Sequence, residues 1–233
     1  MGNAKKIIMV SKEDLHAAVS IVTWNSEKYI KDLLDSLKAQ TFQGFHIIIV
    51  DNASTDKTLE IVKEYKGAVV IRNSVNIGFS RAHNKALEMA LKFWGGKDLN
   101  ERFFAVCNPD IVLEPNCLEV LLTDIWRDKS AAAVGPKLLR LYADYNSLES
   151  SKSSIIDSMG LKIFKSGRVI DNFSGVKDIQ QFSRQEVFGI SGAFMCIRVK
   201  ALLDIKYNKE YFDEDFFAYK EDIDLCWRLR NLG

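Results

Sequence analysis

The residues best suited to chemistry follow an apolar run that ends in two polar side chains. Residues 103–107 read Phe-Phe-Ala-Val-Cys, which is typical of a buried strand, and Asn108 and Asp110 come directly after it. Pro109 stops the strand between them. A carboxylate at the carboxyl end of a buried strand lies where open α/β sheets bind ligands. The alternative interpretation is a plain turn, because Asn and Asp beside Pro are common turn residues.

Two other predicted strands are followed by polar residues in the same way. Since parallel strands share one carboxyl edge, these side chains are expected to converge on one crevice. Three such ends favour a ligand site over isolated helix caps. The polar residues at the three ends are Thr23 and Asn25, Asp51 and Asn52, and Asn108 and Asp110.

A second dense region of ionisable residues lies near the end of the sequence. Acidic residues at a helix start complement its macrodipole, and Asp224 with Arg228 has the spacing of a helical ion pair. The same acids are interleaved with aromatic residues, and apolar neighbours raise the pKa of a carboxylate, as a general base requires. The carboxylates are Asp213, Glu214, Asp215, Glu221, Asp222 and Asp224.

Hydrophobic periodicity predicts the elements that position these groups. Strand and helix alternate four times, which predicts an α/β fold with a doubly wound, mostly parallel central sheet and helices on both faces. The second half predicts a smaller mixed part. The expected strands are 19–23, 47–50, 68–71, 103–107, 131–134 and 187–197, with a hairpin at 161–170. The expected helices contain 30–37, 80–93, 116–126 and 221–232, with another starting near 54–56 and reaching 65, and 147–154 is expected to be a Ser-rich loop.

Composition excludes several classes of function. The 233 residues carry 32 basic and 31 acidic side chains, a balance that calls for no nucleic acid. No apolar stretch is long enough for a transmembrane segment, and no signal peptide is visible. Four cysteines without a C-x-x-C pair and three scattered histidines argue against a zinc site and against a Ser-His-Asp triad. We therefore expect a cytoplasmic protein.

The segment after the first strand lacks a Gly-rich phosphate loop. Residues 24–27 read Trp-Asn-Ser-Glu, which argues against a dinucleotide-binding dehydrogenase and against a P-loop enzyme. A bound diphosphate would need a divalent cation instead. Oxygen ligands such as Asp110 suit Mg²⁺ or Mn²⁺.

Six motifs, taken together, resemble the inverting family-2 glycosyltransferases of the GT-A fold, within them the rhamnosyltransferase-like branch. They occur in that family's order and cover nearly the whole chain. The motifs are Val-Ser-Ile-Val-Thr-Trp-Asn at 19–25, Val-Asp-Asn-Ala-Ser-Thr-Asp at 50–56, Asn-x-Gly-Phe at 76–79 with Asn84, Asn-Pro-Asp at 108–110, Ser-Gly-Ala at 191–193, and Phe-Asp-Glu-x-Phe-Phe-x-Tyr-x-Glu-Asp-x-Asp-Leu at 212–225 with Arg228.

The resemblance implies a role for each motif. Asp222 would be the general base, with Glu221 supporting it, and Asp110 would be the metal ligand. Asp51 would accept the imide N–H of a pyrimidine base. The implied donor-binding residues are Thr23, Asn25, Asp51, Asn52, Ser54, Asn76, Gly78, Asn84, Asn108, Asp110, Ser191 and Gly192.

The resemblance also implies a reaction and its partners. A single GT-A domain over 1–233, with a nucleotide-sugar half at 1–140 and an acceptor-side half at 141–233, would transfer a sugar, rhamnose by branch. The donor would be a UDP- or dTDP-sugar, and the acceptor a glycan or lipid-linked hydroxyl in cell-surface polysaccharide synthesis. Peripheral contact with the inner face of a membrane would follow from such an acceptor. The alternatives are a sugar nucleotidyltransferase and a non-catalytic sugar-nucleotide-binding module.

Two features depart from the family pattern. Asn108 stands where the motif usually has an Asp, which removes one negative charge from the expected metal site. The chain stops at Gly233, right after the expected closing helix, whereas relatives commonly continue. We therefore expect modest metal affinity and a truncated enzyme.

Overall fold

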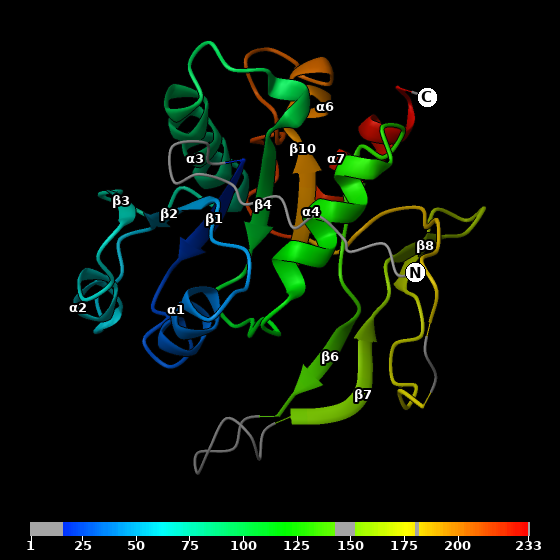
Figure 1. The fold of residues 1–233 in the computed structure, drawn as a ribbon, viewed down its shortest axis with the longest axis horizontal. Coiled ribbons are helices and arrows are strands. Elements are labelled where there is room, and N and C mark those ends of the chain that lie inside the picture. Colours follow the sequence, from blue (N-terminus) through cyan, green and yellow to red (C-terminus); the bar gives the residue numbers. More distant parts are fainter. Residues whose placement is uncertain (1–15, 143–151, 180–181, 233) are drawn as a thin grey trace, which may run out of the picture.

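The computed structural model describes residues 16–142, 152–179 and 182–232. A six-stranded sheet forms its centre (Figure 1). The first four strands along the chain run parallel to one another. A fifth strand pairs antiparallel with the fourth, and the edge strand pairs antiparallel with the fifth. In spatial order the strands are β3 (Ala68–Arg72), β2 (Phe45–Asp51), β1 (Ala17–Thr23), β4 (Phe103–Cys107), β10 (Phe194–Arg198) and β5 (Ala133–Val134). The α/β, mostly parallel architecture predicted from the sequence is confirmed.

Helices pack on both faces of this sheet and close two hydrophobic cores. The helices are α1 (Ile30–Lys38), α2 (Thr58–Lys63), α3 (Phe79–Phe93), α4 (Cys117–Arg127), α6 (Val199–Asp204) and α7 (Glu221–Arg230), with a short 3-10 helix η1 (Leu99–Glu101). Successive residues of β4 point to opposite faces, so Phe104 joins the core with α3 and α7, while Phe103 joins the core with α1 and α4. No helix among the described residues could cross a membrane.

Four short strands lie outside the central sheet. β6 (Leu138–Leu141) pairs with β7 (Lys152–Ser158), and β8 (Leu161–Ile163) pairs with β9 (Val169–Asp171), both antiparallel. The β6–β7 pair extends away from the central sheet in Figure 1. The β8–β9 pair confirms the hairpin predicted at 161–170. The β6–β7 pair and α6 were not predicted.

Several predicted boundaries are corrected. Of the predicted loop at 147–154, residues 147–151 lie outside the described residues and the rest begin β7. The predicted strand at 187–197 is a strand only from Phe194, because Gly189 and Gly192 before it pack closely on α7 instead of pairing in the sheet. The second helix begins at Thr58, since the Asp56 carboxylate accepts from the Thr58 N–H and holds the preceding residues in a turn.

His83, on α3, is buried against β1. Its ring is fully buried, its Nδ1 lies 2.7 Å from the Ser20 hydroxyl, and it contacts the rings of Phe79 and Phe212. Burial lowers the pKa of His83 from its ordinary value to about 3. The His83 ring is therefore uncharged in the folded protein at neutral pH.

Acidification should destabilise the fold through His83. Because the folded-state pKa is depressed, this contribution to stability is complete above the unfolded-state pKa of 6.5 and is lost as pH falls toward 3. The expected loss from this group near pH 5 is about 2 kcal/mol. Urea unfolding of the wild type and of His83→Gln at both neutral pH and pH ~5 measures it. The variant should start less stable and lose less on acidification; equal losses would contradict the role of His83.

Candidate functional site

The Asp51 carboxylate ties the carboxyl ends of β1 and β2 together. It is fully buried and accepts hydrogen bonds from the Thr23 hydroxyl at 2.9 Å, the Ser54 hydroxyl at 2.5 Å and the Ser54 backbone N–H at 3.1 Å. Three donors satisfy both oxygens, as a buried carboxylate requires. The structure therefore brings Thr23 and Asp51 together at the strand ends, with Ser54 beside them. The contact of Asp51 with a pyrimidine base stays a prediction.

Asn25 and Asn52 extend this network in two directions. The Asn25 backbone has φ 49° and donates from its N–H to the Ser54 hydroxyl at 2.9 Å. The Asn52 side chain donates to the Gly78 carbonyl at 3.1 Å and accepts from the Asn73 amide at 2.8 Å. Polar groups of the β1 and β2 ends are thereby connected to the start of α3.

The start of α3 holds the acidic-aromatic segment, defined here as residues 212–220. Gly78 has φ 84°, and a Cβ at this position would lie 2.6 Å from the Phe217 carbonyl oxygen. The Phe79 N–H donates to that same carbonyl at 2.7 Å. Glycine is needed here both for its backbone conformation and for this close approach. The Asn76 side chain accepts from the Gly78 N–H and fixes the turn.

Asn84 anchors the other end of the acidic-aromatic segment. Its amide donates to the Phe212 carbonyl at 2.8 Å and to Glu214 at 3.1 Å, and its carbonyl accepts from the backbone N–H of Tyr211 and Phe212. Arg81, one turn earlier on α3, pairs with Glu214 at 3.0 Å. The structure thus shows Asn84 as an anchor, and its predicted contact with the donor stays a prediction.

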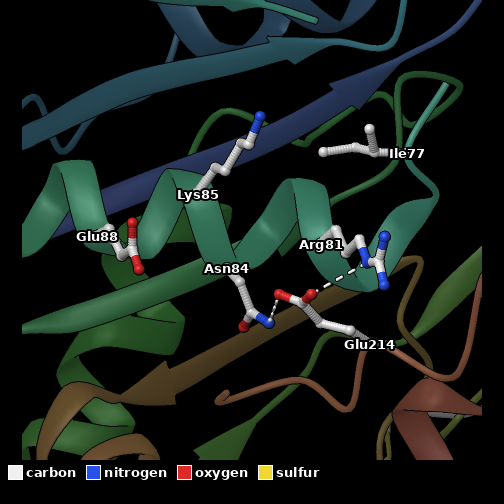
Figure 2. A pocket seen from close by; sticks show the side chains of 6 residues that line it. All are labelled: Ile77, Arg81, Asn84, Lys85, Glu88 and Glu214. Atoms are coloured by element: carbon white, nitrogen blue, oxygen red, sulfur yellow. Dashed lines mark hydrogen bonds and ion pairs between the residues drawn. The ribbon is translucent and has the colours of Figure 1, made fainter. Parts of the chain in front are cut away.

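A cavity of about 370 Å³ opens beside this anchor (Figure 2). Asn84 is the only predicted donor-binding residue on its wall, and none of the predicted strand-end residues lines it. Sequence reasoning missed its basic residues Arg81 and Lys85, although their spacing with Asn84 places all three on one helical face. The lining residues are Ile77, Arg81, Asn84, Lys85, Glu88 and Glu214.

Asp222 is held in place by the segment that precedes β10. Its Oδ2 accepts the Gly192 N–H at 3.0 Å and its Oδ1 accepts the Ile223 N–H at 2.8 Å. A Cβ at Gly192 would lie only 3.3 Å from the Asp222 Cβ, so the backbone of this segment packs closely on Asp222. Ser191 stabilises the same turn, because its hydroxyl accepts the Ala193 N–H at 3.3 Å.

The same segment connects Asp222 to the end of β4. The Asn108 N–H donates to the Ala193 carbonyl at 2.9 Å, one residue after the Gly192 contact with Asp222. The Asn-Pro-Asp turn and the start of α7 therefore border the same short stretch of backbone. The structure brings these predicted residues into one neighbourhood.

Glu221 is buried beside Asp222, but no hydrogen bond joins their side chains in the described part of the chain. Glu221 is 7% exposed, and its Oε2 has no hydrogen-bond partner there. Burial, and to a lesser extent the charge of Asp222, raises the pKa of Glu221 above its ordinary value. Direct support of Asp222 by Glu221 stays a prediction.

Asp110 offers an exposed carboxylate for a metal ion at the end of β4. Among the described residues, no group of three or more His, Cys, Asp or Glu side chains could hold a metal by itself. Mg²⁺ is commonly held by one or two carboxylates together with substrate phosphates. One exposed carboxylate beside Asn108 fits that mode of binding and does not fit an all-protein metal cage.

Comparisons with known proteins find relatives in sequence and in fold. An uncharacterized glycosyltransferase of Haemophilus influenzae is 30% identical over 125 residues, which are 52% of this chain and 36% of the relative. The N-acetylglucosaminyl-diphospho-decaprenol L-rhamnosyltransferase of Mycobacterium tuberculosis is 26% identical over 227 residues, 92% of this chain and 70% of the relative. The mannosyltransferase of Pyrobaculum calidifontis, solved with GDP-Man and Mn²⁺, superposes with a TM-score of 0.60 at 15% identity, over 94% of this chain and 52% of that one.

These matches show the family and the fold. The chain spans 36% and 70% of the two relatives and about half of the solved structure. A model described as "Glycosyl transferase family 2" matches residues 18–205, which is most of the described sequence. The chain belongs to glycosyl transferase family 2 and has the GT-A fold of these glycosyltransferases.

Proposed function

We propose that this chain transfers a sugar from a nucleotide diphosphate donor to an acceptor hydroxyl, with inversion at the anomeric carbon. The observation that carries the proposal is the position of Asp222. Its carboxylate is fixed by the Gly192 N–H in the same short segment that bonds to the end of β4, where Asp110 lies. The proposed base and the proposed metal ligand therefore border one stretch of backbone, as a single displacement needs.

The proposed reaction is one displacement with Asp222 as the general base. Asp222 takes the proton of the acceptor hydroxyl as that oxygen forms a bond to the anomeric carbon. The bond from this carbon to the phosphate oxygen breaks, and its electrons leave with the nucleoside diphosphate. No covalent intermediate with the protein is needed, and the new bond forms on the face opposite the leaving group.

The diphosphate carries the charge that grows during the reaction. A divalent cation, when bound, would neutralise that charge, and Asp110 with Asn108 would hold it. The neighbour solved with GDP-Man and Mn²⁺ supports this choice of metal. Because Asn108 contributes no charge, the donor phosphates would supply much of the affinity.

The proposed acceptor is a lipid-linked glycan in cell-surface polysaccharide synthesis, and the proposed sugar is rhamnose. Support comes from the relative that covers most of this chain, whose name gives a decaprenol-linked acceptor and a rhamnosyl group. The donor base would be uracil or thymine, since both present the same N–H to Asp51. A screen of UDP-, dTDP- and GDP-sugars for hydrolysis would identify the donor.

Nucleotide binding should be visible as thermal stabilisation. With Mn²⁺ present, UDP or dTDP at about 100 times its dissociation constant should stabilise the fold by about 2.7 kcal/mol, which raises Tm by roughly 5–10 °C. Uridine and thymidine serve as controls that lack the diphosphate. Absence of a shift with every nucleoside diphosphate would contradict the donor site.

A further inference from the structure

The β8–β9 hairpin ends in an exposed basic and aromatic tip, defined here as Lys162–Arg168. The Phe164 N–H donates to the Arg168 carbonyl and the Gly167 N–H donates to the Phe164 carbonyl, both at 2.9 Å, so the turn is well formed. The Phe164 side chain is 40% exposed in this turn. The Lys162 ammonium lies 5.3 Å from the centre of its ring.

The tip carries three positive charges and no negative charge. Lys162, Lys165 and Arg168 are all exposed, and none of them forms an ion pair with a residue that the structure describes. The exposed Phe164 ring and the three basic side chains belong to one turn, so an apolar surface and positive charges are available to the same partner. Such a combination is typical of contacts with the headgroup region of a membrane, where rings enter the interface and basic residues meet anionic lipids.

The stretch of sequence that contains the tip is also basic, although the whole chain is nearly neutral. The described residues between 137 and 179 include seven Lys or Arg but three Asp and no Glu. Large hydrophobic side chains are also exposed here more densely than elsewhere in the described chain. They are Leu139, Leu141, Tyr142, Phe164, Phe173, Val176 and Ile179.

The hairpin is joined directly to the segment that fixes Asp222. The Leu161 N–H donates to the Gly189 carbonyl at 2.7 Å, and a Cβ at Gly189 would lie 2.9 Å from the Cys226 Cβ on α7. Three residues later, Gly192 holds Asp222. A surface bound at the tip would therefore have a fixed relation to Asp222.

We propose that the Lys162–Arg168 tip docks the protein on an anionic membrane surface. Phe164 enters the interface, and the three basic side chains contact anionic headgroups. The docked protein would meet lipid-linked acceptors in the plane of the membrane; this last consequence depends on the proposed sugar transfer, whereas membrane binding does not.

Vesicle co-sedimentation tests the docking. The protein should bind vesicles of phosphatidylcholine with phosphatidylglycerol, bind phosphatidylcholine alone weakly, and be released by salt. Each basic residue near an anionic surface raises the membrane affinity roughly fivefold. The K162Q/K165Q/R168Q variant should therefore bind vesicles roughly a hundredfold more weakly. Phe164→Ser should weaken binding to a smaller extent. The matched control K63Q/K66Q/K92Q removes three exposed lysines from α2, the residues just after it, and α3, and should bind like the wild type.

The outcomes separate the docking from the sugar transfer. The docking would be overturned if the wild-type protein did not bind anionic vesicles, or if the tip and control variants lost the same amount of vesicle binding. If the protein bound heparin as tightly as it binds vesicles, and heparin displaced it fully from the vesicles, the docking would also be overturned in favour of a soluble polyanion. With a water-soluble acceptor, the tip variant should retain the kcat and KM of the wild type. Absence of transfer by every variant would contradict the proposed function alone.

Discussion

Replacing Asp222 by Asn should lower kcat by roughly 10²- to 10⁴-fold while leaving nucleotide binding unchanged. The amide keeps the size of the carboxylate, and its oxygen can still accept the Gly192 N–H, so the fold around Gly192 should persist although the bond from the Ile223 N–H is lost. What the variant loses is the ability to take a proton from the acceptor hydroxyl. Turnover with a saturating acceptor, and UDP or dTDP affinity by calorimetry, measure the two effects separately.

Asp224 provides the matched control for this experiment. It lies on the same first turn of α7 and pairs with Arg228 at 2.8 Å, a partly buried ion pair that the sequence spacing predicted. Asp224→Asn makes the same chemical change without touching the proposed base, so it should retain activity. Undiminished turnover in Asp222→Asn, or an equal loss in both variants, would reject Asp222 as the base.

Replacing Asp110 by Ala should remove the metal dependence of nucleotide binding. In the wild type, Mn²⁺ should tighten UDP or dTDP binding, because the proposed site combines one carboxylate with the phosphate oxygens. Without Asp110 the affinity should be the same with and without Mn²⁺. Nucleotide titrations at several Mn²⁺ concentrations measure the coupling between metal and nucleotide.

The reverse change is available at Asn108. Asn108→Asp adds a carboxylate at the same turn and should shift the Mn²⁺ titration to lower concentration, since a second negative charge favours the cation. Asp171→Ala removes an exposed carboxylate from β9 and should leave the titration unchanged. An unchanged Mn²⁺ titration in Asp110→Ala would reject this metal site.

Much of the sheet could be read from the sequence because its pattern is local. The strand at 103–107 has the predicted limits, since five apolar residues form one fully buried stretch between polar neighbours. Parallel pairing of β1 with β2 and β4 then places Thr23, Asp51 and Asn108 at one edge, as the alternation of strands and helices predicted. The boundary error at 187–193 lies where tertiary contacts override propensity, since Gly189 and Gly192 contact α7.

The sequence by itself determined the residue types at the strand ends and the order in which they occur along the chain. Tertiary structure alone decided which residues far apart in the sequence contact one another. Asn84 reaches Phe212 across 128 positions, and Gly192 reaches Asp222 across 30. Such contacts depend on how α3 and α7 pack on the sheet, and no periodic pattern within either segment specifies that packing. Local propensity therefore determined the helices and strands, whereas the packing of the helices on the sheet determined which residues contact Asp222.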